Sequence, residues 1–162
     1  MEKFQELRQL ANKKLQLADH ILTMTYPMVK DPRLLLSSVE NLFLAFSYGM
    51  GSVLHYERLF KRIPPFLDKF TTKFELFKDK CTKIYNINEE YLQIMKDLRA
   101  IIIAHKKSPM EFSRNESFFI CNGNSYRMKT ISINEVKNYV EKAKLFIKNI
   151  STIVSKDEAI FR

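Results

Sequence analysis

The sequence predicts an all-α fold: an up-and-down bundle of about five helices with a short β-hairpin inserted before the last helix. Only three glycines and five prolines occur in 162 residues, so few positions interrupt long helices. Apolar residues recur at three- and four-residue steps through most of the chain, as in amphipathic helices. One stretch instead carries an Asn-Gly turn between two β-prone runs. The length and the absence of a linker predict a single domain over residues 1–162.

The first helix is predicted over residues 4–25. Its apolar positions form one helical stripe, which comprises Leu7, Leu10, Leu17, Ile21 and Met24. We expect Tyr26-Pro27 to end this helix, because proline lacks a backbone N–H and restricts the residue before it. The connection to the next helix is short, so the first two helices should be antiparallel neighbours.

The longest and most apolar helix is predicted over residues 32–61, and we expect the other elements to pack around it. Asp31 can cap it, and Pro32 suits the first helical position. No residue from Asn41 to Leu54 is charged, so other protein surfaces must cover most of the helix. That run is too short to span a bilayer, and we expect no association with a membrane.

The same helix carries a polar stripe on one side. The stripe comprises Ser37, Asn41, Tyr48, Ser52 and His55, with two glycines nearby. Three interpretations remain open: the solvent face of a long helix, a crossing with another helix, or a groove for a ligand.

The third helix is predicted over residues 66–85. It carries a seam that is rich in phenylalanine, and this seam comprises Leu67, Phe70, Phe74, Phe77, Cys81 and Ile84. Such a seam is typical of a core, whereas aromatic surfaces that stack on bases are exposed on sheets or grooves. A fourth helix is predicted over residues 89–105, with Asn88 as its cap and acidic residues in its first turn.

The hairpin is predicted at about residues 117–131, because Asn122-Gly123 supplies the backbone angles of a tight reversal. An isolated hairpin is marginally stable in water, so it must pack against the bundle. Ser132 and Glu135 form a capping box that opens the last helix. That helix keeps heptad spacing at Ile133, Val136, Val140, Ala143, Ile147, Ile150 and Val154.

The chain is basic, with a formal net charge of +9 and 27 Lys and Arg residues against 18 acidic ones. Such a field attracts phosphate-rich partners, although a lysine-rich solvated surface produces the same balance. Cys81 and Cys121 lack metal-ligand spacing, and the three histidines lie in separate predicted helices. We therefore expect no metal and no cofactor, and a reduced, cytoplasmic protein.

The fourth helix carries the most informative residues. His105 continues its main apolar stripe, which comprises Tyr91, Ile94, Leu98 and Ile101. Arg99 lies about 120° around the helix from His105, between Leu92 and Ile103, which form a second apolar patch. A helix with two apolar patches needs two packing partners, and the second partner here is predicted to be another subunit of a homodimer.

The segment Arg99-Ala-Ile-Ile-Ile-Ala-His105 resembles the R-x(4–6)-H motif of HEPN domains, which are all-α modules that often dimerise around it. The resemblance implies a protein directed at RNA and, in active members, metal-independent RNA cleavage. His105 would act as acid or base on the ribose 2′-hydroxyl, and Arg99 would stabilise charge on the phosphate. Ala100 stands where many active members have Asn, Asp or His, and the hairpin is not a usual feature of the family.

Basic residues follow the motif directly, and we expect them to form a rim that contacts RNA phosphates. They are Lys106, Lys107, Arg114, Arg127 and Lys129. Phe119 and Tyr126 are expected to be cross-strand neighbours in the hairpin, where they could stack on bases or anchor the hairpin to the bundle.

Two functional hypotheses follow. In the first, the chain is a HEPN-like, RNA-directed protein and a metal-independent endoribonuclease with Arg99 and His105 as catalytic residues. In the second, it is a non-enzymatic helical scaffold that binds RNA, a ribonucleoprotein or a protein partner through its basic face. A purely structural role for the motif also stays open, with Arg99 in a salt bridge and His105 hydrogen-bonded at the helix end.

Overall fold

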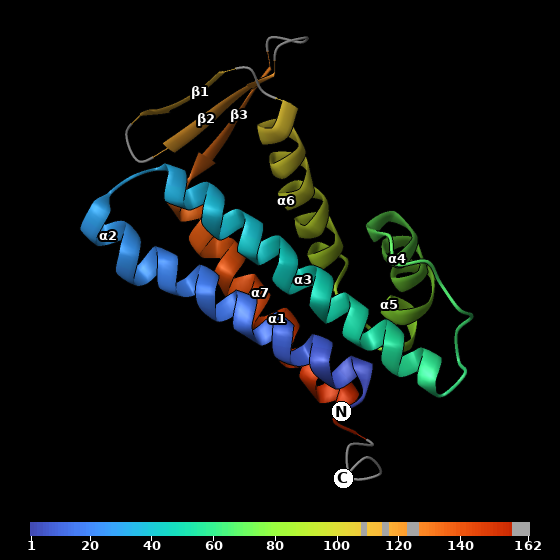
Figure 1. Cartoon of the computed structure of the whole chain (residues 1–162). Coiled ribbons are helices and arrows are strands. Elements are labelled where there is room, and N and C mark those ends of the chain that lie inside the picture. Colours follow the sequence, from blue (N-terminus) through green and yellow to red (C-terminus); the bar gives the residue numbers. More distant parts are fainter. Residues whose placement is uncertain (108–109, 115–116, 123–126, 157–162) are drawn as a thin grey trace.

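The computed structural model describes residues 1–107, 110–114, 117–122 and 127–156, with side chains outside 107–130. These residues form five main helical segments and a small sheet that precedes the last helix (Figure 1). The predicted fold class is therefore confirmed. The sheet lies at one end of the bundle, beyond the N-terminal end of the central helix, and the short helices α4 (Phe70–Leu76) and α5 (Thr82–Ile84) lie toward the other end (Figure 1).

The first helical segment is longer than predicted. Helix α1 (Lys3–His20) continues through a π-helical turn, η1 (Ile21–Thr25), into α2 (Tyr26–Val29). The prediction that Tyr26-Pro27 ends the helix is wrong. In the π-helical turn the N–H of Tyr26 bonds to the carbonyl of Ile21, five residues back, and this wider turn accommodates a proline that would clash in a regular α-helix.

The central helix α3 (Arg33–Leu59) runs antiparallel to α1, as predicted. Two buried serines join the helices: Ser38 donates to the carbonyl of Ala18 at 3.2 Å and Ser52 donates to that of Phe4 at 2.7 Å. At Ser52, the predicted polar stripe is therefore a helix crossing. Asp31 Oδ1 accepts the N–H of Arg33 at 3.0 Å and so satisfies the start of the helix.

The third segment begins later than predicted. It consists of α4 (Phe70–Leu76), the π-helical turn η2 (Phe77–Cys81) and α5 (Thr82–Ile84). Phe66 is not helical because its ring packs against α3, 5.1 Å from the ring of His55. Phe74, Phe77 and Cys81 are buried as predicted.

The two ends of the predicted seam are exposed instead of buried. Leu67 lies before α4 and is 65% exposed, and Ile84 is 58% exposed at the end of α5. The stretch that faces the core is therefore shorter than the periodic apolar pattern. The five residues of η2 turn through an i+5 pattern, so residues after it no longer keep the phase of those before it.

The last two helices agree closely with the sequence pattern. Helix α6 (Glu89–Lys107) is capped by Asn88, whose Oδ1 accepts the N–H of Glu90 at 2.9 Å. Helix α7 (Ile133–Val154) is capped by Ser132, whose Oγ accepts the N–H of Glu135 at 3.3 Å. The heptad positions of α7 from Val136 to Val154 are buried.

The predicted hairpin is part of a three-stranded antiparallel sheet. Its strands are β1 (Met110–Arg114), β2 (Ser117–Asn122) and β3 (Arg127–Ser132), in the order β1-β2-β3. Strands β2 and β3 form the predicted hairpin, and β1 is an additional strand. The register places Phe119 opposite Thr130, and Tyr126 lies outside the described residues. The sheet contacts α3, α6 and α7, so it packs on the bundle.

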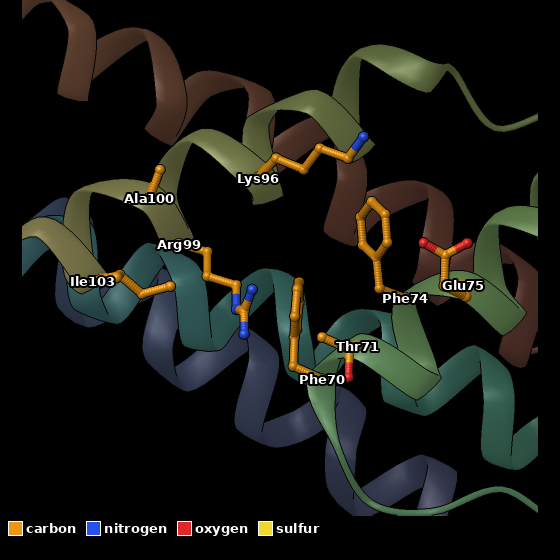
Figure 2. A pocket seen from close by; sticks show the side chains of 8 residues that line it. All are labelled: Phe70, Thr71, Phe74, Glu75, Lys96, Arg99, Ala100 and Ile103. Carbon is orange, nitrogen blue, oxygen red and sulfur yellow. The ribbon is translucent and has the colours of Figure 1, made fainter.

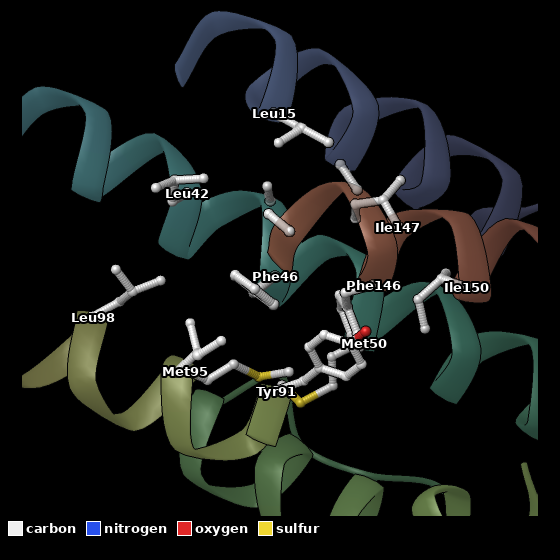
Figure 3. Close-up of a cluster of buried hydrophobic side chains, with 14 of the residues drawn as sticks. Leu15, Leu42, Phe46, Met50, Tyr91, Met95, Leu98, Phe146, Ile147 and Ile150 are labelled. Carbon is white, nitrogen blue, oxygen red and sulfur yellow. The ribbon is translucent and has the colours of Figure 1, made fainter. Parts of the chain in front are cut away.

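The core lies where α3, α6 and α7 meet (Figure 3). Phe146 of α7 is fully buried at this point, and its ring centroid lies 5.0 Å from that of Phe46 and 5.3 Å from that of Tyr91. Gly49 lets α7 approach α3 closely, since a Cβ at this position would lie 3.0 Å from the Phe146 ring. Within the described residues, no helix combines the length and apolarity needed to cross a membrane.

Candidate functional site

Arg99 projects from α6 toward α4 (Figure 2). Its guanidinium carbon lies 5.2 Å from the ring centroid of Phe70, and its side chain is partly exposed. No carboxylate in the described part of the chain lies within ion-pair distance of it. The predicted alternative of a salt bridge at Arg99 is therefore wrong within those residues. An aromatic face fixes the guanidinium and leaves its N–H edge available to an anion.

Lys96, one helical turn before Arg99, repeats this arrangement. Its Nζ lies 5.6 Å from the ring centroid of Phe74, which is the next phenylalanine on the same face of α4. The two cations border an open pocket of about 290 Å³ between α4 and α6. The residues that line it are Phe70, Thr71, Phe74, Glu75, Lys96, Arg99, Ala100 and Ile103 (Figure 2).

The second flank of α6 is therefore covered by α4 of the same chain. The sequence predicted a second partner for α6 because of the patch that contains Leu92 and Ile103. Leu92 is buried within the chain, and Ile103 lines the pocket beside α4. The covering is incomplete, since the pocket keeps Arg99 and Lys96 accessible.

His105 lies in the last turns of α6 and is half-buried. It is not among the residues that line the pocket of Arg99. His105 comes six positions after Arg99 on one helix, so their Cα atoms differ by about 9 Å along the axis and about 120° around it. Within one chain, the described residues that form the pocket of Arg99 therefore do not include His105, the other predicted catalytic residue.

The predicted basic rim is described only in part. Lys106 is exposed at the end of α6, beside His105. Lys107 ends α6, Arg114 ends β1, and Arg127 and Lys129 belong to β3; their backbones are described and their side chains are not. The strand β2, which pairs with both β1 and β3, contacts α6. The backbone of the rim therefore lies at the same end of the bundle as His105.

A separate polar cluster is buried at the end of α3. The carboxylate of Glu57 is fully buried, forms an ion pair with Arg62 at 2.8 Å and accepts a hydrogen bond from the hydroxyl of Tyr85. Burial and this hydrogen bond raise the pKa of Tyr85. Burial, with the nearby charge of Glu57, raises the pKa of Cys81 to about 12. These groups satisfy one another, so the cluster is structural, and its thiol is not a nucleophile near neutral pH.

Metal binding has no donor cluster in the part of the chain that the structure describes: no three His, Cys, Asp or Glu side chains are grouped so that they could hold an ion. The charged side chains that line the pocket of Arg99 are Lys96, Arg99 and Glu75. An arginine and a lysine on one helix face can contact successive phosphates of a nucleic acid without reading its bases.

Lys96 is a candidate site residue that was not predicted from the sequence. Its spacing carried a usable signal, since Lys96, Arg99 and Ile103 follow an i, i+3, i+7 pattern and share one face of α6. The stacking of these cations on Phe70 and Phe74 had no such signal, because it depends on how α4 packs against α6.

Comparison with known proteins gives no relative for this chain. No protein-family model, no curated protein and no solved structure matches it.

Proposed function

We propose that this chain is a HEPN-like, RNA-directed protein that binds RNA through the face of α6 that carries Lys96 and Arg99. One observation carries the proposal: both cations are supported by phenylalanine rings at the edge of an open pocket. In the described residues neither has a carboxylate within ion-pair distance. RNA phosphates would supply the missing negative charge.

The endoribonuclease part of the proposal requires two chains. Arg99 and His105 do not line one pocket within a chain, so a composite site needs Arg99 of one protomer and His105 of the other. In such a homodimer His105 transfers the proton of the ribose 2′-hydroxyl and Arg99 neutralises charge on the phosphate. No metal ion takes part.

Binding is tested with a fluorescent single-stranded RNA at several salt concentrations. We expect the double variant Lys96→Gln/Arg99→Gln to bind about tenfold more weakly at low salt and with a shallower salt dependence, since two phosphate contacts are lost. The matched control is Lys137→Gln/Lys148→Gln, which removes the same charge from exposed positions of α7. Equal weakening by both double variants would show that only the net charge matters.

Cleavage is tested on labelled RNA in EDTA. We expect the wild type to cleave, and His105→Ala to lose about 100-fold or more in rate, because one proton-transfer group is removed. His20→Ala, at an exposed position of α1, is the control and should cleave normally. Absence of cleavage by the wild type removes the catalytic claim and leaves the binding claim standing.

A second candidate function is non-enzymatic binding of RNA or a ribonucleoprotein by the basic face around the sheet. The observation that favours it is the separation of His105 from the Arg99 pocket within one chain. It predicts salt-sensitive binding that Arg127→Ala and Lys129→Ala weaken and that His105→Ala leaves unchanged.

A further inference from the structure

A second cluster of cations lies where the start of α1 meets the end of α3, at the end of the bundle away from the sheet (Figure 1). A pocket of about 330 Å³ opens between these elements. Among the described residues, Lys3, Arg58 and Lys61 line it together with His55, and Glu2 is the only one of these lining residues with a carboxylate. These described side chains, three cations and one carboxylate, carry a net charge of +2 around one cavity.

The cations at this pocket are weakly neutralised by the described residues. No carboxylate of those residues lies within 4.0 Å of Arg58 or Lys61. Lys3 is 3.8 Å from Glu6, and both side chains are at least half exposed, so this ion pair is weak. The carboxylate of Glu2 is engaged in the capping box of α1.

The ring of Phe66 contacts both Arg58 and His55. The guanidinium carbon of Arg58 lies 5.9 Å from its ring centroid, and the ring of His55 meets it edge-on at 5.1 Å. An aromatic ring, and not a carboxylate, therefore sets the position of Arg58. Its N–H donors stay available for a planar, bidentate partner such as a phosphate.

His55 is partly buried in surroundings where cations outnumber carboxylates. Its pKa is lowered by burial and, in addition, by Lys3, Arg58 and Lys73, which outweigh the opposing effect of Asp68. These groups come from α1, α3, α4 and the segment before α4. The negative charge of a bound anion would raise the pKa of His55 and so favour the protonated imidazole. The protonated ring would then be one more hydrogen-bond donor to the anion.

We propose that the pocket formed by Lys3, His55, Arg58 and Lys61 binds a phosphate monoester. The two uncompensated positive charges match the charge of about −2 that a phosphate monoester carries near neutral pH, whereas a phosphodiester carries only about −1. The volume of the pocket accommodates the phosphate and the first atoms of its carrier. This site is separate from the Arg99 pocket, so either can fail without the other.

The test uses methyl phosphate and dimethyl phosphate as a matched monoester and diester, with binding followed by the NMR signals of His55. We expect methyl phosphate to shift these signals and to raise the pKa of His55, and dimethyl phosphate to bind at least tenfold more weakly. Sulfate serves for the pH series, because the charge of phosphate itself changes near neutral pH. Sulfate should bind more tightly as the pH falls through the pKa of His55, and His55→Gln should remove this dependence.

Charge-matched variants separate a site from the general field of a basic protein. We expect Arg58→Gln and Lys61→Gln each to weaken methyl phosphate binding at least tenfold, and Lys137→Gln, which lies at the start of α7, to leave it within twofold. Lys61 is exposed, so its variant remains informative if Arg58→Gln does not fold. Equal weakening by all three variants, equal binding of both esters, or unmoved His55 signals would overturn the proposal.

The source of the phosphate is distinguished by two RNA oligonucleotides that differ only in a 5′-phosphate or a 5′-hydroxyl. Competition with methyl phosphate by the 5′-phosphorylated strand alone assigns the pocket to an RNA end. Competition by neither strand assigns it to a small phosphorylated molecule. Equal competition by both strands would mean that the pocket binds phosphodiesters, which contradicts the proposal.

Discussion

The carboxylate of Glu57 is the most strongly constrained charge among the described residues. It is fully buried and is satisfied by Arg62 and by the hydroxyl of Tyr85. We expect Glu57→Ala to lower the free energy of unfolding by about 3 kcal/mol, because the buried end of the network loses its anion and leaves a cavity. Urea denaturation followed by circular dichroism measures the change.

Tyr85→Phe is a smaller change in the same network. It should lower the free energy of unfolding by about 1 kcal/mol, since one hydrogen bond to the carboxylate is lost. The control is Glu141→Ala, which breaks an exposed ion pair with Lys144 and should cost less than about 0.5 kcal/mol. A similar loss for Glu57→Ala and Glu141→Ala would contradict the structural role assigned to the buried network.

His55 makes the stability of the fold depend on pH. Its pKa in the folded protein lies below the unfolded value of about 6.5, chiefly because of burial. The unfolded chain therefore binds more protons between these two values. The contribution of His55 is fully present above about pH 6.5 and decreases as the pH falls through this window toward the folded pKa.

We expect the wild type to lose more stability than His55→Gln when the pH is lowered from about 7.5 to 5.5, because the carboxylates contribute equally to both proteins and cancel in the difference. Thermal unfolding in buffers without phosphate or sulfate measures this difference. If both proteins lost the same stability over this pH range, the pKa of His55 would not be lowered in the folded protein.

Among the elements, α3 offers a direct test of helix packing, because two of its glycines have different surroundings. A Cβ on Gly49 would lie 3.0 Å from Cε1 of Phe146 and 3.1 Å from Cδ1 of Ile147, both in the core. A Cβ on Gly51 would meet only Leu7, at an ordinary 3.4 Å. The contact between α3 and α7 therefore depends on Gly49 in particular.

Gly51→Ala should stabilise the protein by about 0.5 to 1 kcal/mol, because alanine favours the helix and the space is sufficient. Gly49→Ala gains the same helix propensity but crowds a ring that is wedged between Phe46 and Tyr91, so it should destabilise by about 1 kcal/mol. Equilibrium urea unfolding of both variants gives the difference. Equal stability would mean that α7 moves away from α3 without cost.

Sequence reasoning succeeded for elements whose ends are set by local chemistry. Asn88 and Ser132 cap their helices by bonds to residues two and three positions ahead, which a sequence displays directly. The predictions were wrong where contacts with residues distant in the sequence determine the ends of an element. Pro27 stays helical because of a π-helical turn upstream, and Phe66 leaves the predicted helix to pack on α3. Strand β1 depends on pairing with β2, which no local pattern displayed.

For the whole molecule, the same distinction explains which candidate functional residues could be predicted from the sequence. Arg99 and His105 could be predicted together because they lie on one helix. The predicted polar stripe of α3 included His55, but it gave no sign of the cations that surround this residue in the fold. Lys3 and Lys61 meet at one pocket only because α1 runs antiparallel to α3. Pockets built from chain segments that are distant in sequence require the fold before they can be recognised.

The proposed composite site can be tested by mixing inactive subunits. In the proposed homodimer, the variants Arg99→Ala and His105→Ala would each lack one of the two proposed catalytic groups at both sites. In a mixed dimer, one site receives Arg99 from the His105→Ala chain and His105 from the Arg99→Ala chain, so it is intact, and the other site lacks both groups. Random exchange makes half of the dimers mixed, so about one quarter of the wild-type cleavage rate should return.

The measurement is RNA cleavage in EDTA after the two variants are unfolded together and refolded to allow exchange. Each variant treated alone is the control and should remain inactive, because no combination of identical chains restores both groups to one site. Recovery requires that the two groups act across a subunit interface, since within one α6 they lie on different sides of the helix. If each variant alone is inactive and the mixture stays inactive although mixed dimers are detected by mass spectrometry, the composite site is wrong and Arg99 and His105 act within one chain.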